Sequence, residues 1–173
     1  MATLPTHALA GWALARFWPG EEKPWQLYAG AAACAVLPDI DAIGFWMGVP
    51  YGDLCGHRGL THSLLFAACT GIACALVARS KRAALPLALA TATHGLLDAL
   101  TNGGLGVAFF SPFSNARYFL PWRPIEVAPI SITDFIEQGG LGSLRGELIW
   151  VWAPTLVLLG VHALITRERT LAP

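Results

Sequence analysis

Long stretches without a charged residue are the feature that most limits how this chain can fold. They cover residues 1–15, 26–38, 60–78, 83–97 and 148–165. The third and the fifth approach the ~20 residues that an α-helix needs to cross a bilayer. The others can still cross if their polar ends lie at the interface or in a cavity lined by protein. We therefore expect an all-α transmembrane bundle of about five helices, at 3–18, 26–46, 60–78, 83–101 and 147–166.

The composition agrees with a membrane protein. Only 13% of the residues are charged and 55% are hydrophobic, whereas soluble domains carry roughly 25% charged residues. The formal net charge is zero, which gives no support to nucleic-acid binding. A length of 173 residues suits one domain, so residues 1–173 are predicted to form a single domain integral to a membrane.

Two connections predict the orientation of the bundle. The turn at residues 79–82, Arg-Ser-Lys-Arg, carries three positive charges and is expected to stay in the cytoplasm. The segment 102–146 is rich in glycine, proline and aromatic residues, and loops of this length are more often functional than idle. We expect it to lie on the outer side and to pack across the end of the bundle there.

Histidine and aspartate residues are concentrated in short apolar contexts. Ionisable residues at membrane depth are costly and indicate a functional site. With the turn at 79–82 inside, seven of them are predicted to meet at the outer end of the bundle: His7, Asp39, Asp41, His57, His62, His94 and Asp98.

The chemistry of this set favours metal binding. His94 and Asp98 are four residues apart, so both project from one face of a helix. Imidazole and carboxylate ligands without thiolate suit Zn²⁺, and also Mn²⁺ or Fe²⁺. Seven ligands exceed the three that a catalytic zinc takes, so two or three divalent ions are expected. The alternative is a purely structural polar network, in which a residue such as Asp39, after a proline, caps a helix.

Arg58 lies between two candidate ligands, and two interpretations of it stay open. Its guanidinium can bind a phosphate or carboxylate oxygen of a substrate. Alternatively, it forms an ion pair with Asp39, Asp41 or Asp53. His162 stands alone in the last helix and is interpreted as structural. The acidic residues outside the set of seven are expected on loop surfaces: Asp53, Asp134 and the glutamates.

Several motifs resemble the YdjM family of inner-membrane-associated, metal-dependent hydrolases. They are His7, the sequence Leu-Pro-Asp-Ile-Asp at 37–41, Gly-His-Arg-Gly-Leu-Thr-His-Ser at 56–63 and His-Gly-Leu-Leu-Asp-Ala-Leu-Thr at 94–101. The segments 102–106 and 117–124 also look like this family. Ala42 is a departure, because many relatives have a histidine there, which puts one possible ligand in doubt.

The resemblance implies a location and an activity. The family is similar, more distantly, to zinc-dependent phospholipase C and the S1/P1 nucleases, whose metal clusters are built from His and Asp. It implies hydrolysis of a phosphoester by a multi-pass protein of the bacterial inner membrane. The predicted topology places the site at headgroup depth on the outer, periplasmic side, so we expect a lipid substrate that is cleaved there through a metal-activated water. Arg58 and Asp41 are the residues expected to take part in catalysis. The alternatives are hydrolysis of an acyl ester or amide of a lipid, and a non-catalytic metal-binding interaction protein.

Overall fold

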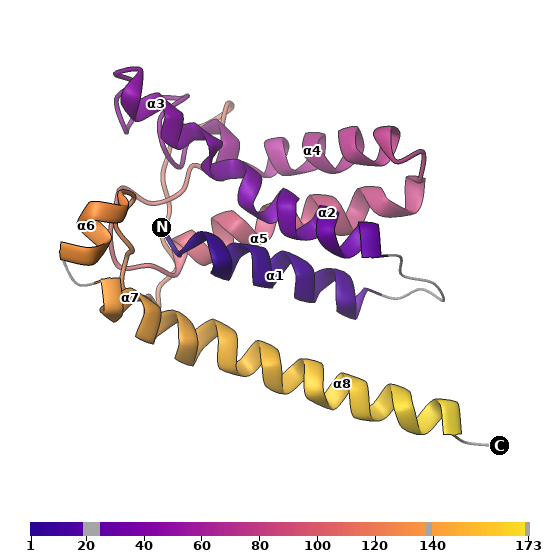
Figure 1. Cartoon of the computed structure of the whole chain (residues 1–173). Coiled ribbons are helices and arrows are strands. Elements are labelled where there is room, and N and C mark those ends of the chain that lie inside the picture. Colours follow the sequence, from indigo (N-terminus) through magenta and orange to yellow (C-terminus); the bar gives the residue numbers. More distant parts are fainter. Residues whose placement is uncertain (19–24, 138–139, 172–173) are drawn as a thin grey trace.

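Four helices of the computed structural model pack side by side (Figure 1). The structure describes residues 1–18, 25–137 and 140–171. The four helices are α1 (Leu4–Phe17), α2 (Trp25–Val36), α4 (Leu64–Val77) and α5 (Ala84–Ala99). Small side chains fill the space between them, among them Ala15, Ala31, Cys34 and Ala90. Small residues let helix backbones approach closely, which is how helices associate where lipid removes the hydrophobic drive.

The ends of these helices follow from local sequence. Pro5 lies in the first turn of α1, where its missing N–H is not needed. The Ser63 hydroxyl caps α4 by accepting a hydrogen bond from the Phe66 N–H at 3.0 Å, as N-cap serines do. After α2, the Leu-Pro sequence begins a 3₁₀ turn, η1 (Leu37–Ala42), which is followed by the short α3 (Ile43–Trp46). The predicted helix at 26–46 is therefore interrupted at the residues that carry Asp39 and Asp41.

The last long helix lies outside the four-helix bundle. It comprises α7 (Gly140–Glu147), a π-helical turn at Leu148–Trp152 and α8 (Ala153–Leu171). Figure 1 shows α8 running along α1. Many of its large apolar side chains are exposed, among them Leu156, Val157 and Leu164. A short helix, α6 (Ile132–Glu137), precedes α7.

Two segments are long and apolar enough to cross a membrane, Trp25–Trp46 and Gly140–Arg167, and Leu64–Val77 is a shorter apolar helix. Helices thus occur in all five predicted ranges, and the described residues contain two isolated β-bridges but no strand. The all-α prediction is confirmed for these residues, whereas a bundle of five membrane-crossing helices stays a prediction.

The loop after α5 closes one end of the bundle, as expected. Its backbone bonds to several elements: the Ala108 N–H to the Arg58 carbonyl at 3.0 Å, the Leu120 N–H to the Ala99 carbonyl at 2.9 Å, and the Ala128 N–H to the Met1 carbonyl at 2.9 Å. The Arg117 guanidinium donates to the carbonyls of His57 and Tyr51 at 2.9 and 3.0 Å. The turn between α4 and α5, which carries the positive charges, lies at the opposite end (Figure 1).

The closest approach between α1 and α2 predicts a stability effect. A Cβ on Gly11 would lie 2.5 Å from the Ala35 Cβ and against the Ala31 carbonyl oxygen. We expect Gly11→Ala to lower the free energy of unfolding by about 1–3 kcal/mol, as overpacking does. Gly160→Ala in α8 is the control, because nothing lies within 4 Å of its added Cβ and alanine favours helix by about 1 kcal/mol. Thermal unfolding in detergent measures both. Equal stability of the two variants would contradict the packing.

Candidate metal centre

All seven predicted ligands are buried at one end of the bundle. His7 lies in the first turns of α1, Asp39 and Asp41 in η1, and His94 and Asp98 in the last turns of α5. His57 lies in the loop before α4, and His62 ends the 3₁₀ turn η2 (Leu60–His62). Each is at most 9% exposed. The sequence prediction that they converge is confirmed, and His162 lies apart from them, with its ring against Phe17 at 5.4 Å.

Four of these residues form one compact group: Asp39, His62, His94 and Asp98. The Nε2 atom of His94 is 3.3 Å from Asp39 Oδ1 and 3.9 Å from Asp98 Oδ2. The Nε2 atom of His62 is 3.7 Å from Asp39 Oδ1 and 3.6 Å from Asp98 Oδ2. The four atoms have no hydrogen-bond partner, although buried polar atoms nearly always have one. Two imidazole nitrogens and two carboxylate oxygens are a donor set that divalent metals use.

The tautomer of His94 explains why this group can hold a cation. Its Nδ1 lies 2.7 Å from the Ala35 carbonyl oxygen. A carbonyl only accepts, so Nδ1 carries the proton and Nε2 of the neutral ring presents a lone pair. That lone pair faces the carboxylate oxygens of Asp39 and Asp98. Three acceptors that face one another in a buried site repel unless a proton or a metal ion lies between them.

Asp41 belongs to a second group, with His57 and His62, whose bonds are made within the protein. Asp41 Oδ1 is 2.6 Å from His57 Nδ1, and Asp41 Oδ2 is 3.1 Å from His62 Nδ1. Oδ2 also accepts from the Thr61 hydroxyl at 2.6 Å and from the Arg58 N–H at 3.2 Å. One carboxylate therefore fixes the rings of two histidines with both Nε2 atoms free. Carboxylates in such positions orient histidine ligands of metals.

His7 packs against the four-residue group. Its ring stacks on the His94 ring, with 3.6 Å between centroids and 10° between planes. Its Nε2 lies 3.4 Å from Asp98 Oδ1, which also accepts the Ala2 N–H at 2.9 Å. His7 therefore contacts Oδ1 of Asp98, whereas His94 faces Oδ2 of the same carboxylate.

Arg58 is fully buried and forms an ion pair with Asp98, not with Asp39, Asp41 or Asp53 as considered from the sequence. Its Nε lies 3.0 Å from Asp98 Oδ2. The other guanidinium nitrogens donate to the Gly103 carbonyl at 2.9 Å and to the Thr101 hydroxyl at 3.1 Å. Gly104 allows this approach, because its φ is +82° and a Cβ there would lie 3.0 Å from Arg58 Nη1. Asp98 was missed as the partner because forty residues separate it from Arg58 in the sequence.

A cavity of about 510 Å³ reaches the cluster at His57. Tyr51, Gly104, Glu126 and Asp134 also line it, so its walls are partly polar. The ring of Tyr51 meets that of His57 edge to face at 5.3 Å. Burial raises the pKa of the Tyr51 phenol, so it keeps its proton at neutral pH. His57 is thus the member of the cluster that lines this cavity, and its buried Nε2 has no hydrogen-bond partner.

Glu147 was predicted at a loop surface, and this prediction is wrong. The residue is 1% exposed, and its carboxylate accepts hydrogen bonds from the Thr3 N–H, the Thr3 hydroxyl and the Thr6 hydroxyl at 2.5, 2.5 and 2.6 Å. Trp152 donates to the Thr6 hydroxyl at 2.7 Å. The carboxylate thus caps α1 from another helix, one turn before His7. A charged residue at the start of an apolar run is the signal that the sequence offered.

The Arg58–Asp98 pair predicts the effect of Arg58→Lys. Lysine keeps the charge but loses the fork that reaches Asp98, Gly103 and Thr101. We expect a loss of about 1–3 kcal/mol in stability, because buried acceptors lose donors, and a ~10–100-fold loss of metal affinity. Metal titration and thermal unfolding on one preparation measure both. Arg123→Lys is the control, since Arg123 is exposed and lies over the Phe119 ring. Unchanged metal affinity in Arg58→Lys would refute the prediction that Arg58 supports metal binding through Asp98.

Comparison with known proteins identifies the family of the chain. A model of the YdjM inner membrane protein family matches residues 1–169. The chain is 36% identical to the inner membrane protein YbcI of Escherichia coli (strain K12) over 167 residues, which are 93% of this chain and 96% of that protein. No solved structure matches the chain. The family match and the identity to YbcI together show that the chain belongs to the YdjM family of inner membrane proteins.

Proposed function

We propose that this protein is a metal-dependent hydrolase of the inner membrane that cleaves a phosphoester of a membrane lipid. The observation that carries the metal proposal is the orientation of His94. Its Nδ1 donates to the Ala35 carbonyl, so the lone pair of Nε2 points toward the carboxylates of Asp39 and Asp98. Charge supports it too. The cluster buries three carboxylates and one guanidinium, so with neutral imidazoles its side chains carry two excess negative charges. One divalent cation balances that charge.

Each residue has a proposed role. Asp39, His62, His94 and Asp98 hold the ion, Asp41 orients His57 and His62, and Arg58 positions Asp98. These last two roles replace the direct catalytic parts expected of Asp41 and Arg58, because their polar atoms are already bonded within the protein. Two or three ions were expected. The hydrogen bonds within the Asp41 group favour one ion in the four-residue group, with His7 beside it.

The chemistry follows from these roles. A divalent ion, with Zn²⁺ the first choice and Mn²⁺ or Fe²⁺ compatible with the ligands, lowers the pKa of water and stabilises negative charge on a phosphoryl oxygen. His57 faces the polar cavity with its Nδ1 proton held by Asp41. Its Nε2 is therefore placed to accept a proton from water, which is the task of a general base.

A structural metal site is the second candidate. Four protein ligands fill a tetrahedral zinc site, whereas catalytic zinc keeps an open position. In this case the ion would only hold α5 and η1 together, and the protein would be a non-catalytic interaction module of the membrane.

Asp39→Asn tests metal binding and hydrolysis together. The amide presents a weaker, uncharged ligand, so we expect purified protein to lose its ion and its hydrolytic activity. Asp53→Asn is the matched control, because Asp53 is an exposed loop carboxylate and should keep both. Elemental analysis, followed by a panel of phospholipids and acyl-ester lipids, gives the two readouts.

The outcomes separate the candidates. Wild-type protein that holds metal but cleaves no lipid supports the structural metal site. Cleavage of acyl-ester lipids alone would show that the hydrolase acts on acyl esters and not on phosphoesters. Wild-type protein without metal refutes both candidates. A second ion that is lost in Asp41→Asn would restore the larger cluster.

We also propose that the cluster faces the periplasm. The turn at 79–82 lies at the end of the bundle opposite to the cluster (Figure 1), and its positive charges favour the cytoplasm. In a background without the four native cysteines, a cysteine at Ser114 should react with an impermeant reagent in intact cells and one at Ser80 should not. The reverse labelling pattern would show that the orientation is the opposite one and that the cluster faces the cytoplasmic leaflet.

A further inference from the structure

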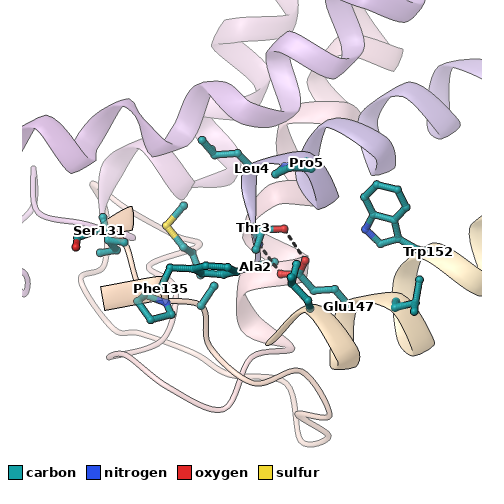
Figure 2. Close-up of a pocket in the computed structure, with 14 residues that line it drawn as sticks. Ala2, Thr3, Leu4, Pro5, Ser131, Phe135, Glu147 and Trp152 are labelled. Atoms are coloured by element: carbon teal, nitrogen blue, oxygen red, sulfur yellow. Dashed lines mark hydrogen bonds between the residues drawn. The ribbon is translucent and has the colours of Figure 1, made fainter. Parts of the chain in front are cut away.

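A second cavity, of about 560 Å³, lies between the start of α1, the segment 128–131 and the helices α6 and α7 (Figure 2). Its walls are mainly hydrocarbon, from Leu4, Ile130, Phe135, Leu144, Leu148 and Trp152. Glu147 also contributes to the wall, but its carboxylate is bonded to Thr3 and Thr6, as the dashed lines to Thr3 in Figure 2 show in part. The volume is in the range of ligand pockets, and the surface suits an apolar occupant.

This apolar cavity adjoins the polar cavity at His57. Met1, Ala128, Pro129 and Ile130 line both of them. The two cavities are therefore neighbours, a polar part beside the cluster and an apolar part away from it. A molecule that fills both parts has a polar head and a hydrocarbon tail.

The position of the apolar cavity indicates where such a molecule comes from. Leu144, Leu148 and Trp152 lie in the first turns of the apolar segment Gly140–Arg167. Trp150, in the same turns, is half exposed and packs edge to face on Trp122 at 4.6 Å. Tryptophan side chains gather at the membrane–water interface. The cavity therefore lies at the level where lipid headgroups meet acyl chains.

We propose that this apolar cavity binds one acyl chain of a membrane phospholipid, with the phosphate of that lipid in the polar cavity beside His57. The proposal rests on the proposed hydrolysis of a lipid for its purpose, but binding itself needs no turnover. It assigns the segment 128–131 and the start of α7 to substrate recognition. The acyl chain would select long-chain lipids over water-soluble phosphoesters.

Photolabelling tests the site. The purified protein is reconstituted in phosphatidylcholine vesicles that contain phosphatidylglycerol with a diazirine in one acyl chain, and labelled residues are mapped by mass spectrometry. We expect labels at Ile130 and Phe135 besides those on the exposed side chains of α8, such as Val157. Labels confined to the exposed surface of α8 would overturn the proposal.

Two substitutions at Leu144 and one control make the test specific. Leu144→Glu places a charge in the cavity and Leu144→Trp fills it, so each should reduce labelling at Phe135 at least ten-fold. Leu141→Glu is the control, because Leu141 lies on the same helix, is 79% exposed and does not line the cavity. Metal content and thermal unfolding report whether each variant is folded. A folded variant at Leu144 with undiminished labelling at Phe135 would refute the site.

The failure of this proposal is distinguishable from that of the proposed function. Cavity labelling in a protein that hydrolyses no lipid leaves the acyl-chain site standing and rejects the hydrolase. Hydrolysis of lipids without cavity labelling rejects the acyl-chain site alone. If both hold, Leu144→Trp should raise KM for a long-chain phospholipid, and the control Leu141→Glu should not.

Discussion

Burial of negative charge is the constraint on which this structure depends. Asp39, Asp41 and Asp98 lie among apolar helices with Arg58 as the buried guanidinium beside them. Each uncompensated buried charge costs several kcal/mol. Much of the local architecture reduces this cost. The Arg58 guanidinium forms an ion pair with Asp98, and the Thr61 hydroxyl and the backbone N–H groups of Ala2 and Arg58 donate hydrogen bonds to Asp41 and Asp98. With neutral imidazoles, the three carboxylates and the one guanidinium leave two negative charges, which the proposed divalent ion would balance.

Two kinds of hydrogen-bond partner orient the histidine rings of the cluster. A backbone carbonyl fixes His94, and a carboxylate fixes both His57 and His62. In all three rings the Nδ1 atom is held and the Nε2 atom is free. The two kinds of partner therefore fix the orientation of all three rings.

The sequence predicted the convergence of the site better than its internal contacts. Charge in apolar stretches and the positive turn at 79–82 were enough to bring seven residues to one end, because helix ends alternate between the two sides of a bundle. Pairings across long separations were not accessible. Asp98 as the partner of Arg58 depends on the left-handed Arg58 (φ 62°), and Glu147 as the cap of α1 joins residues 144 positions apart. The break of the second helix at η1 was also missed, although Pro38 marks it.

The bond between Glu147 and the start of α1 has a consequence for biogenesis. His7 precedes the other members of the cluster in the sequence and is therefore synthesised before them. Glu147 and Trp152, which bond to the first turn of α1, are not members of the cluster. They follow all of its residues in the sequence and are synthesised after them. Until these two residues are synthesised, the nascent chain therefore lacks the side chains that hold the first turn of α1 beside the cluster. Translation products that end before Glu147 would lack these hydrogen bonds to Thr3 and Thr6.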